Sequence, residues 1–212
     1  MSTVSPMSRA LVVRAWLPDR PGALGQVASR IGAVHGDVTA IDILERGGGR
    51  VVDELVVSLP ESTSQELLAR EVGAVDGVFV EHIRPTEAER PDSATAILEL
   101  AARVARAAPT ERLPTLTDGL VAAVDADWAV AVRHDRVLHR HGDAPEVGWL
   151  MAFLDGCEHL EAANPAAAPS DVVWARLPRT GIAIAAGRAH RPVHERERSR
   201  VGLLALIADA LL

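Results

Sequence analysis

The amino-acid sequence predicts an α+β protein built from two successive domains. The first ninety residues alternate β-type runs with helical periodicity, in the order strand, helix, strand, strand, helix, strand. A polar stretch bracketed by Pro85 and Pro91 follows, and residues 94–212 then alternate helices and strands in a different order. At 212 residues, the chain has the length of one large domain or two small ones.

The first strand and the first helix meet at a tight turn. Residues 11–17 form a β-rich run, and the sequence Pro-Asp-Arg-Pro-Gly at 18–22 stops it. Apolar residues then follow at the spacing of an amphipathic helix, namely Leu24, Val27, Ala28, Ile31 and Val34. We expect this helix to end near Gly36, with that glycine as its C-cap.

A hairpin, a second helix and a last strand complete the first half. Residues 38–45 and 51–59 are β-type runs, separated by a glycine-rich turn at 46–50. A second helix follows Ser62, and residues 78–83 form the last strand. The βαββαβ order predicts a ferredoxin-like arrangement, in which a four-stranded antiparallel sheet carries both helices on one face.

Apolar side chains are expected on both faces of this first sheet. Val12 and Trp16 of the first strand point away from the helices, and so do Val52 and Val56 of the third strand. Large apolar residues on an uncovered face favour a packing partner there, either the second half or another subunit.

The second half predicts the order ααββαββα. The expected elements are helices at 94–108 and 113–124, strands at 128–132 and 136–140, a helix at 146–158, strands at 172–177 and 181–188, and a terminal helix reaching residue 212. The segment 161–169 contains two prolines and is expected to be a loop. At the start of the terminal helix, arginines alternate with Glu195 and Glu197, which is typical of a solvated surface.

Composition excludes several kinds of chemistry. The 22 basic residues are all arginine, so a Schiff-base lysine, a phosphate-loop lysine and a Ser-Lys dyad are excluded. The single cysteine, Cys157, excludes an internal disulfide and a Cys-rich zinc site. The net charge is −7 and neither half is basic, so we expect no nucleic-acid partner.

The chain shows no signal for export or for membrane insertion. The first nine residues are short and polar, and no window approaches about 18 uninterrupted apolar residues. We therefore expect an unprocessed cytoplasmic protein that does not enter a membrane.

The turn at residues 17–24 is the most informative candidate site. Backbone N–H groups of Gly22, Ala23 and Leu24 at a helix N-terminus would attract a carboxylate, and Gly22 would let it approach closely. Asp19 could accept hydrogen bonds from an ammonium group, so the turn suits the two ends of an amino acid. The alternative is purely structural: Asp19 caps the helix, Pro21 lies in its first turn, and Gly22 relieves crowding.

The motif Asp-Arg-Pro-Gly-Ala-Leu at 19–24, within a βαββαβ order, resembles the ACT domain, a small-molecule-binding regulatory module of amino-acid metabolism. The resemblance covers about residues 9–85, with residues 86–93 as the linker. It implies side-by-side dimers with joined sheets. An amino acid or related effector would then lie between Asp19 and Gly22, Ala23 and Leu24 of one subunit and Ile41 and Asp42 of its neighbour.

Residues 94–212 resemble a GAF domain. Two leading helices, a hairpin at 128–140 and the closing pattern Gly-Ile-Ala-Ile-Ala-Ala-Gly-Arg at 181–188 carry the resemblance. It implies an α/β/α sensor layer, with a pocket near residues 151–169 and dimerisation through terminal helices. With about 118 residues and a short middle, this segment departs from the longer family form, which favours a structural copy without a bound cofactor.

Enzymatic readings find little support. His139 and His141 share one strand face, and Cys157 and His159 lie nearby in sequence, but neither pair has the usual spacing of metal ligands. Surface histidines and a buried cysteine are the simpler interpretation. Asp53 and Glu54 are adjacent on a strand and so face opposite sides, unlike a catalytic carboxylate pair.

The sequence therefore predicts a non-catalytic regulatory protein that needs neither a metal nor a cofactor. Its ACT-like domain would dimerise and bind an amino acid or related effector, and the second domain would relay the signal or assemble the protein. The alternative is a ligand-free interaction protein that oligomerises or docks onto a partner enzyme.

Overall fold

The computed structural model describes residues 8–163 and 171–212, with the backbone alone for 158–163. Contacts divide the chain into two compact units, Met1–Asp92 and Ser93–Leu212. The elements of the first unit are β1 (Ser8–Pro18), α1 (Ala23–Ala33), β2 (Asp37–Gly47), β3 (Arg50–Pro60), α2 (Gln65–Gly73) and β4 (Phe79–Thr86). This sequence of elements confirms the predicted βαββαβ order.

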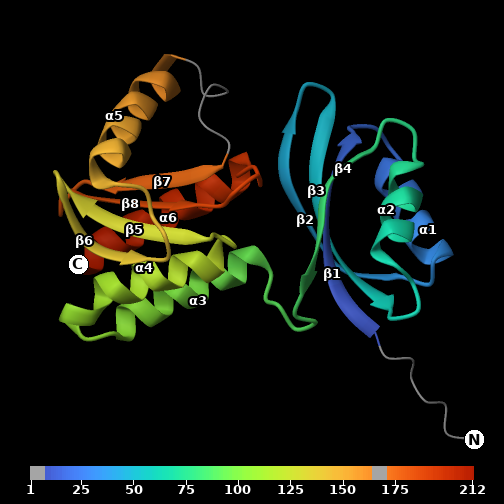
Figure 1. The fold of residues 1–212 in the computed structure, drawn as a ribbon, viewed down its shortest axis with the longest axis horizontal. Helices are drawn as coiled ribbons and strands as arrows, with labels where there is room; N and C mark the ends of the chain where they lie inside the picture. The colour runs from blue at the N-terminus through green and yellow to red at the C-terminus, as the bar shows by residue number, and fades with distance from the viewer. Residues whose placement is uncertain (1–7, 164–170) are drawn as a thin grey trace, which may run out of the picture. The chain divides into compact units, whose positions relative to one another are not determined.

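The first sheet is antiparallel, with the strand order β2-β3-β1-β4. Helices α1 and α2 cover one face of it (Figure 1). Alternate residues of β1 and β3 point to that face and are fully buried against the helices, among them Leu11, Val13, Leu55, Val57 and Leu59. Burial of these side chains holds the helices on the sheet.

Two local predictions in the first unit need correction. Helix α1 does not end on a left-handed glycine, because His35 takes the left-handed conformation with φ of 61°. Gly36 is required for another reason: a Cβ there would lie 2.8 Å from Cγ2 of Ile31. Strand β4 also runs beyond residue 83 to Thr86, and Pro85 is tolerated because β4 is an outer strand of the sheet.

The sheet face opposite the helices is not simply apolar. In its centre, the guanidinium of Arg14 donates to Oε2 of Glu54 from Nη2 at 2.5 Å and from Nε at 3.1 Å. Nε1 of Trp16 donates to Oε2 of Glu81 at 2.9 Å. An ion pair therefore lies among the valines that the sequence analysis placed on this face.

The second unit confirms the predicted order ααββαββα, with one short 3₁₀ turn added. Its elements are α3 (Ser93–Arg106), η1 (Pro109–Glu111), α4 (Arg112–Ala123), β5 (Trp128–Arg133), β6 (Arg136–His141), α5 (Val147–Ala163), β7 (Val172–Leu177), β8 (Ile182–Gly187) and α6 (Glu195–Leu211). Helix α5 continues through residues 161–163, where a loop was predicted. The rest of that predicted loop, 164–169, lies outside the described residues.

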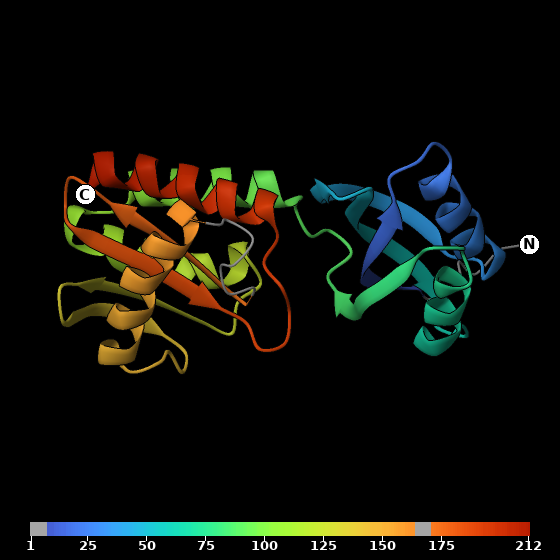
Figure 2. The same ribbon diagram turned by 90° about the horizontal axis from the view of Figure 1, so that it is seen from above.

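The second sheet is antiparallel with the order β6-β5-β8-β7, and helices cover both of its faces. Figure 2 shows α5 on one side and α3, α4 and α6 on the other. Two cores follow from this layering. Leu150 and Leu154 of α5 pack on Val130 and Val132, while Ile184 of β8 faces the three other helices.

The start of α6 is more than a solvated surface. Glu197 is 8% exposed, and both of its oxygens accept hydrogen bonds from Nη2 of the buried Arg188, at 2.9 and 2.8 Å. The same guanidinium donates to the carbonyl of Val124 at 2.8 Å. This buried pair ties α6 to β8 and to the end of α4, and Glu197 also accepts the N–H of the N-cap residue His194.

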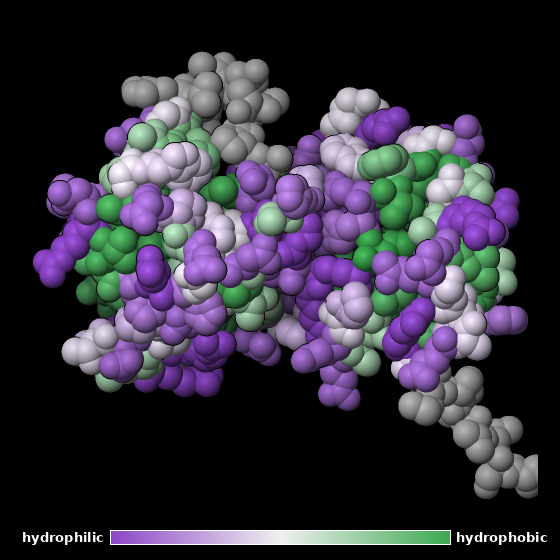
Figure 3. Space-filling view, in the orientation of Figure 1, coloured by the Kyte–Doolittle hydropathy of each residue, from purple (hydrophilic) through white to green (hydrophobic). Residues whose placement is uncertain are grey.

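Hydrophobic side chains also reach the surface. Figure 3 shows them in green among hydrophilic residues, including a group near the C-terminal end of the chain. Within the residues described, none of the helices has the length and apolar character needed to cross a bilayer.

Close packing of α3 against α4 leads to a stability prediction. A Cβ at Gly119 would lie 2.2 Å from Cδ1 of Leu100, which is buried and cannot move freely. Gly119→Ala should lower the free energy of unfolding by about 1–2 kcal/mol, because overpacking exceeds the gain in helix propensity. Urea denaturation measures this change.

Gly202→Ala is the matched control, because Gly202 also lies inside a helix but has no atom within 4 Å of a new Cβ. It should stabilise the protein by about 0.5–1 kcal/mol. Equal effects of the two substitutions would contradict the described packing of α3 on α4.

Candidate functional site

The turn between β1 and α1 leaves backbone donors unpaired. Gly22 is the N-cap residue of α1, and no side chain caps the helix. The N–H of Ala23 donates to the carbonyl of Arg20 at 3.3 Å, while Leu24 and Gly25 donate to no protein group in the described chain. Of the three N–H groups that the sequence indicated, those of Gly22 and Leu24 donate to no protein group in the described chain, whereas that of Ala23 does. Gly25 adds an unpaired donor that the sequence analysis did not name.

Gly22 adopts a conformation that other residues rarely take. Its φ is 86°, and a Cβ built there would meet no atom within 4 Å. Space in front of the turn is therefore open, and the requirement for glycine comes from the backbone conformation rather than from crowding. The alternative in which Gly22 relieves crowding is wrong for this reason.

Asp19 does not cap the helix. Its Oδ1 lies 3.6 Å from Nη1 of Arg46, and both side chains are largely exposed. The N–H of Asp19 donates to the carbonyl of Gly49 at 2.9 Å, which fastens the turn to the hairpin between β2 and β3. In that hairpin Gly48 and Gly49 both have positive φ, as the glycine-rich turn predicted.

A buried carboxyl group, which the sequence analysis did not assign to the site, accompanies this turn. Asp53 pairs with Ala15 in the regular register of β1 and β3, so it shares the helix-covered face with Leu55. The residue is 3% exposed, and its buried Oδ1 has no hydrogen-bond partner in the described structure. A carboxylate in that position is costly unless something pairs with it.

The electrostatics of Asp53 connect it to the turn. Burial raises the pKa of the Asp53 carboxyl, the positive charge of Arg46 opposes this rise, and the negative charge of Asp19 adds to it. Asp53 thus interacts electrostatically with Arg46 and with Asp19, which lies in the turn before α1. A buried titratable group with a perturbed pKa and specific charge partners is a candidate for a functional site.

Ile41 and Asp42 lie apart from this cluster, on the outer strand β2. They pair with Leu55 and Glu54, so Ile41 faces the helix side of the sheet and Asp42 the opposite side. Ile41 is 48% exposed. A single chain therefore does not bring Ile41 and Asp42 together with the β1–α1 turn.

The other candidates from the sequence have simpler roles. His139 and His141 both contact Oδ1 of Asp118, at 2.9 and 3.2 Å, and their hydrogen bonds outweigh desolvation to lower the pKa of the Asp118 carboxyl. In the described part of the chain, no three His, Cys, Asp or Glu side chains are grouped to hold a metal ion. Cys157 is 2% exposed, as expected of a buried cysteine, whereas His159 lies among residues whose side chains are not described.

Comparisons with known proteins give structural similarity only. No protein-family model matches the chain, and no curated protein does. Among solved structures, the ACT domain from GTP pyrophosphokinase of Chlorobium tepidum is 16% identical and matches over 38% of this chain and 100% of its own, with a TM-score of 0.31. A putative glycine cleavage system transcriptional repressor is 13% identical over 73% of this chain and 94% of its own, with a TM-score of 0.31.

A protein of unknown function from Galdieria sulphuraria is 12% identical over 85% of this chain and 81% of its own, with a TM-score of 0.34. The similarity to ACT-domain proteins is one of fold alone. The GAF resemblance of residues 94–212 is not supported.

The burial of Asp53 predicts a pH-dependent stability. Because its folded-state pKa lies above the unfolded value of about 3.9, stability falls as the pH rises from about 4 through the folded-state pKa. Asp53→Asn removes this penalty and should raise the melting temperature at pH 7 by a few degrees. The difference from the wild type should vanish near pH 4.

Melting curves between pH 4 and pH 8 measure this effect. Asp76→Asn is the control, because Asp76 is an exposed aspartate of the same unit, in the turn before β4. A wild type that melts above Asp53→Asn at pH 7 would show that a partner stabilises the charged carboxylate, and would contradict the account.

Proposed function

We propose that this chain is a non-catalytic regulatory protein whose first unit binds an amino acid or a related small effector at the β1–α1 turn. One observation carries the proposal: the first unit combines unpaired N–H groups at Leu24 and Gly25 with a buried Asp53 whose Oδ1 has no partner in the described structure and whose carboxyl group senses the charge of Asp19 in the turn. The first suits a carboxylate and the second suits an ammonium group. An α-amino acid carries both.

The structure supports Asp53 as the acceptor for the ammonium group, in place of Asp19, which the sequence motif suggested. Asp19 already pairs with Arg46, whereas Oδ1 of Asp53 has no partner in the described structure. Burial disfavours the ionised form of the Asp53 carboxyl group. An ammonium group of the ligand would stabilise that form, so Asp53 is the carboxyl group whose pairing with the ligand would be most favourable. The space next to Gly22 is open.

The resemblance to ACT domains adds a dimer to this proposal. Strand β2 is an outer strand, and Ile41 on it is 48% exposed on the helix side of the sheet. A second copy that adds its β2 at this edge would bring Ile41 and Asp42 toward the turn of its neighbour. Effector binding would then stabilise one dimer arrangement, and the second unit would relay that bias or assemble the protein.

One feature favours the second candidate, a ligand-free interaction protein. Helix α6 exposes Leu203, Leu206 and Ile207, which are 62%, 60% and 42% accessible and lie three and four residues apart. This spacing places them on one helix face, as expected of a surface for oligomerisation or for docking onto a partner enzyme. Such a protein would not respond to amino acids.

Thermal unfolding in the presence of each of the twenty amino acids separates the two candidates. If the protein is regulatory, one amino acid should raise the melting temperature of the full chain. At a concentration a hundredfold above its Kd, the amino acid should increase the free energy of unfolding by about 2.7 kcal/mol. Asp53→Asn should abolish this response while remaining folded, because it removes the charge that attracts the ammonium group.

Asp76→Asn should respond as the wild type does, because it lies outside the turn. The proposal is wrong if no amino acid shifts the melting temperature of the folded protein, or if Asp53→Asn responds like the wild type. The first outcome, together with an oligomer in solution, would favour the interaction protein.

A further inference from the structure

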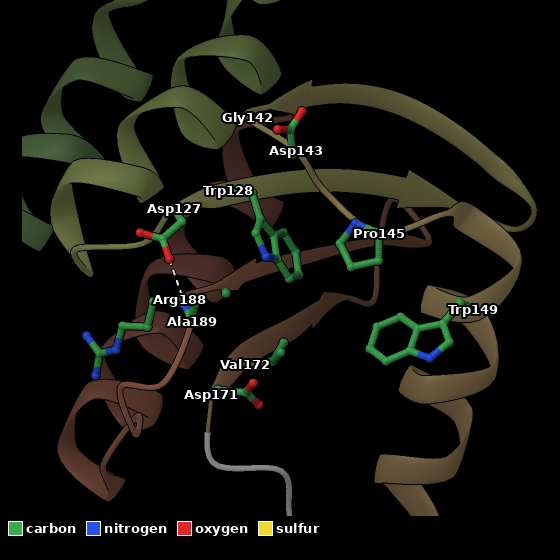
Figure 4. A pocket seen from close by; sticks show the side chains of 11 residues that line it. Asp127, Trp128, Gly142, Asp143, Pro145, Trp149, Asp171, Val172, Arg188 and Ala189 are labelled. Carbon is green, nitrogen blue, oxygen red and sulfur yellow. Dashed lines mark hydrogen bonds between the residues drawn. The ribbon is translucent and has the colours of Figure 1, made fainter.

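The second unit contains a cavity of about 520 Å³ at one end of its sheet. Strands β5 and β7 begin there, β8 ends there, and the loop between β6 and α5 closes another side (Figure 4). Small-molecule sites typically have about 300–1,000 Å³, so the cavity has the size of a metabolite site. It lies entirely within the second unit and is independent of the turn at Gly22.

Backbone contacts fix one aromatic wall of this cavity. The indole of Trp128 lies so close to β8 that a Cβ at Gly187 would come within 2.3 Å of its Cζ2. Gly142 has φ of 68°, and a Cβ there would lie 2.5 Å from the carbonyl oxygen of Asp127. Glycine at both positions lets the ring and the loop approach the backbone, which holds Trp128 in place.

A second indole stands at the rim. Trp149 of α5 is 52% exposed and stacks on Phe153, with ring centroids 5.0 Å apart and an angle of 18° between the planes. Leu150 and Leu154 of the same helix fill the core below it. Stacking on Phe153 therefore orients the indole of Trp149. Because this indole is half exposed, it stabilises the folded protein less than a fully buried indole would.

The charges around the cavity are predominantly negative. Arg188 lines it, but its guanidinium is bonded to Glu197 and to the carbonyl of Val124. Asp127 accepts hydrogen bonds from the N–H of Ala189 at 2.7 Å and from Nη2 of Arg191 at 2.9 Å.

Two further aspartates, Asp143 and Asp171, are exposed, and their carboxylates have no partner among the described residues, although the backbone carbonyl of Asp171 accepts the N–H of Arg188. The beginning of α5 contributes about half a positive charge, which is less than these two carboxylates supply.

We propose that this cavity binds a small organic cation with an ammonium or guanidinium group. The indoles of Trp128 and Trp149 line the cavity and are electron-rich rings of the kind that attracts such groups, and the carboxylates of Asp143 and Asp171 provide the opposite charge. A neutral molecule of the same shape gains only the apolar contact, and an anion is repelled.

Choline and agmatine, which carry a quaternary ammonium and a guanidinium group, are the probes, and 3,3-dimethylbutan-1-ol is the neutral isostere of choline. Calorimetric titration of the full chain, together with tryptophan fluorescence, measures binding. At least one cation should bind saturably, and the neutral isostere should bind at least about tenfold more weakly than choline if choline is that cation.

Two variants locate the site. Trp149→Ala removes an exposed ring, and the pair Asp143→Asn and Asp171→Asn removes the charges; each should weaken binding at least about tenfold without loss of folding. Asp135→Asn, at an exposed carboxylate in the turn between β5 and β6, should bind as the wild type does. The proposal is overturned if neither cation binds saturably, if choline binds and its neutral isostere binds equally well, or if binding survives both pocket variants.

Discussion

The first unit depends on how the chain leaves its central strand. Strand β1 pairs with both β3 and β4, so its register fixes the whole sheet, and α1 must begin within a few residues of its end to cover that sheet. Gly22 makes this reversal possible because it adopts a φ of 86°. The same reversal leaves a helix N-terminus without a side-chain cap, so the constraint that builds the fold also creates the unpaired donors.

The two units differ in whether their buried charged groups have hydrogen-bond partners. Arg188 and Glu197 neutralise each other, and additional carbonyl groups satisfy the guanidinium, so this pair fixes the position of α6. Asp53 is buried to a similar degree, yet its Oδ1 has no partner in the described residues and its pKa is raised by burial. A satisfied pair is typical of a structural role, whereas a buried carboxyl group with an unpartnered oxygen is a candidate for ligand binding.

Periodicity and turn chemistry predicted the order of the elements in both units, because alternating apolar residues and glycine-rich turns are local signals. The positive φ of Gly48 and Gly49 is one example, since two glycines between β-type runs favour a tight hairpin. In the second unit, Val130 and Val132 of β5 point to one face of the sheet and Ala129 and Ala131 to the other, so both faces are buried beneath helices.

What the sequence did not reveal depends on contacts between distant residues. The pairing of Arg188 with Glu197 turned an apparently solvated helix start into a buried anchor. Asp53 could have been noticed, because it precedes Leu55, Val57 and Leu59 on the face assigned to the core, where a carboxyl group is unusual. The cavity between Trp128 and Trp149 had no such signal, since it joins segments that are far apart in the chain.

Amide chemical shifts in an ¹⁵N-labelled sample of the full chain test the central claim most directly. Amino acids are added one at a time, and the resonances of Leu24 and Gly25 are followed. If the turn receives the carboxylate of an effector, one amino acid should move these two amides saturably, and more than the amides of the α2 N-terminus, which Ser64 caps. If no amino acid moves them, or if the changes fall elsewhere in the chain, the β1–α1 turn is not a binding site.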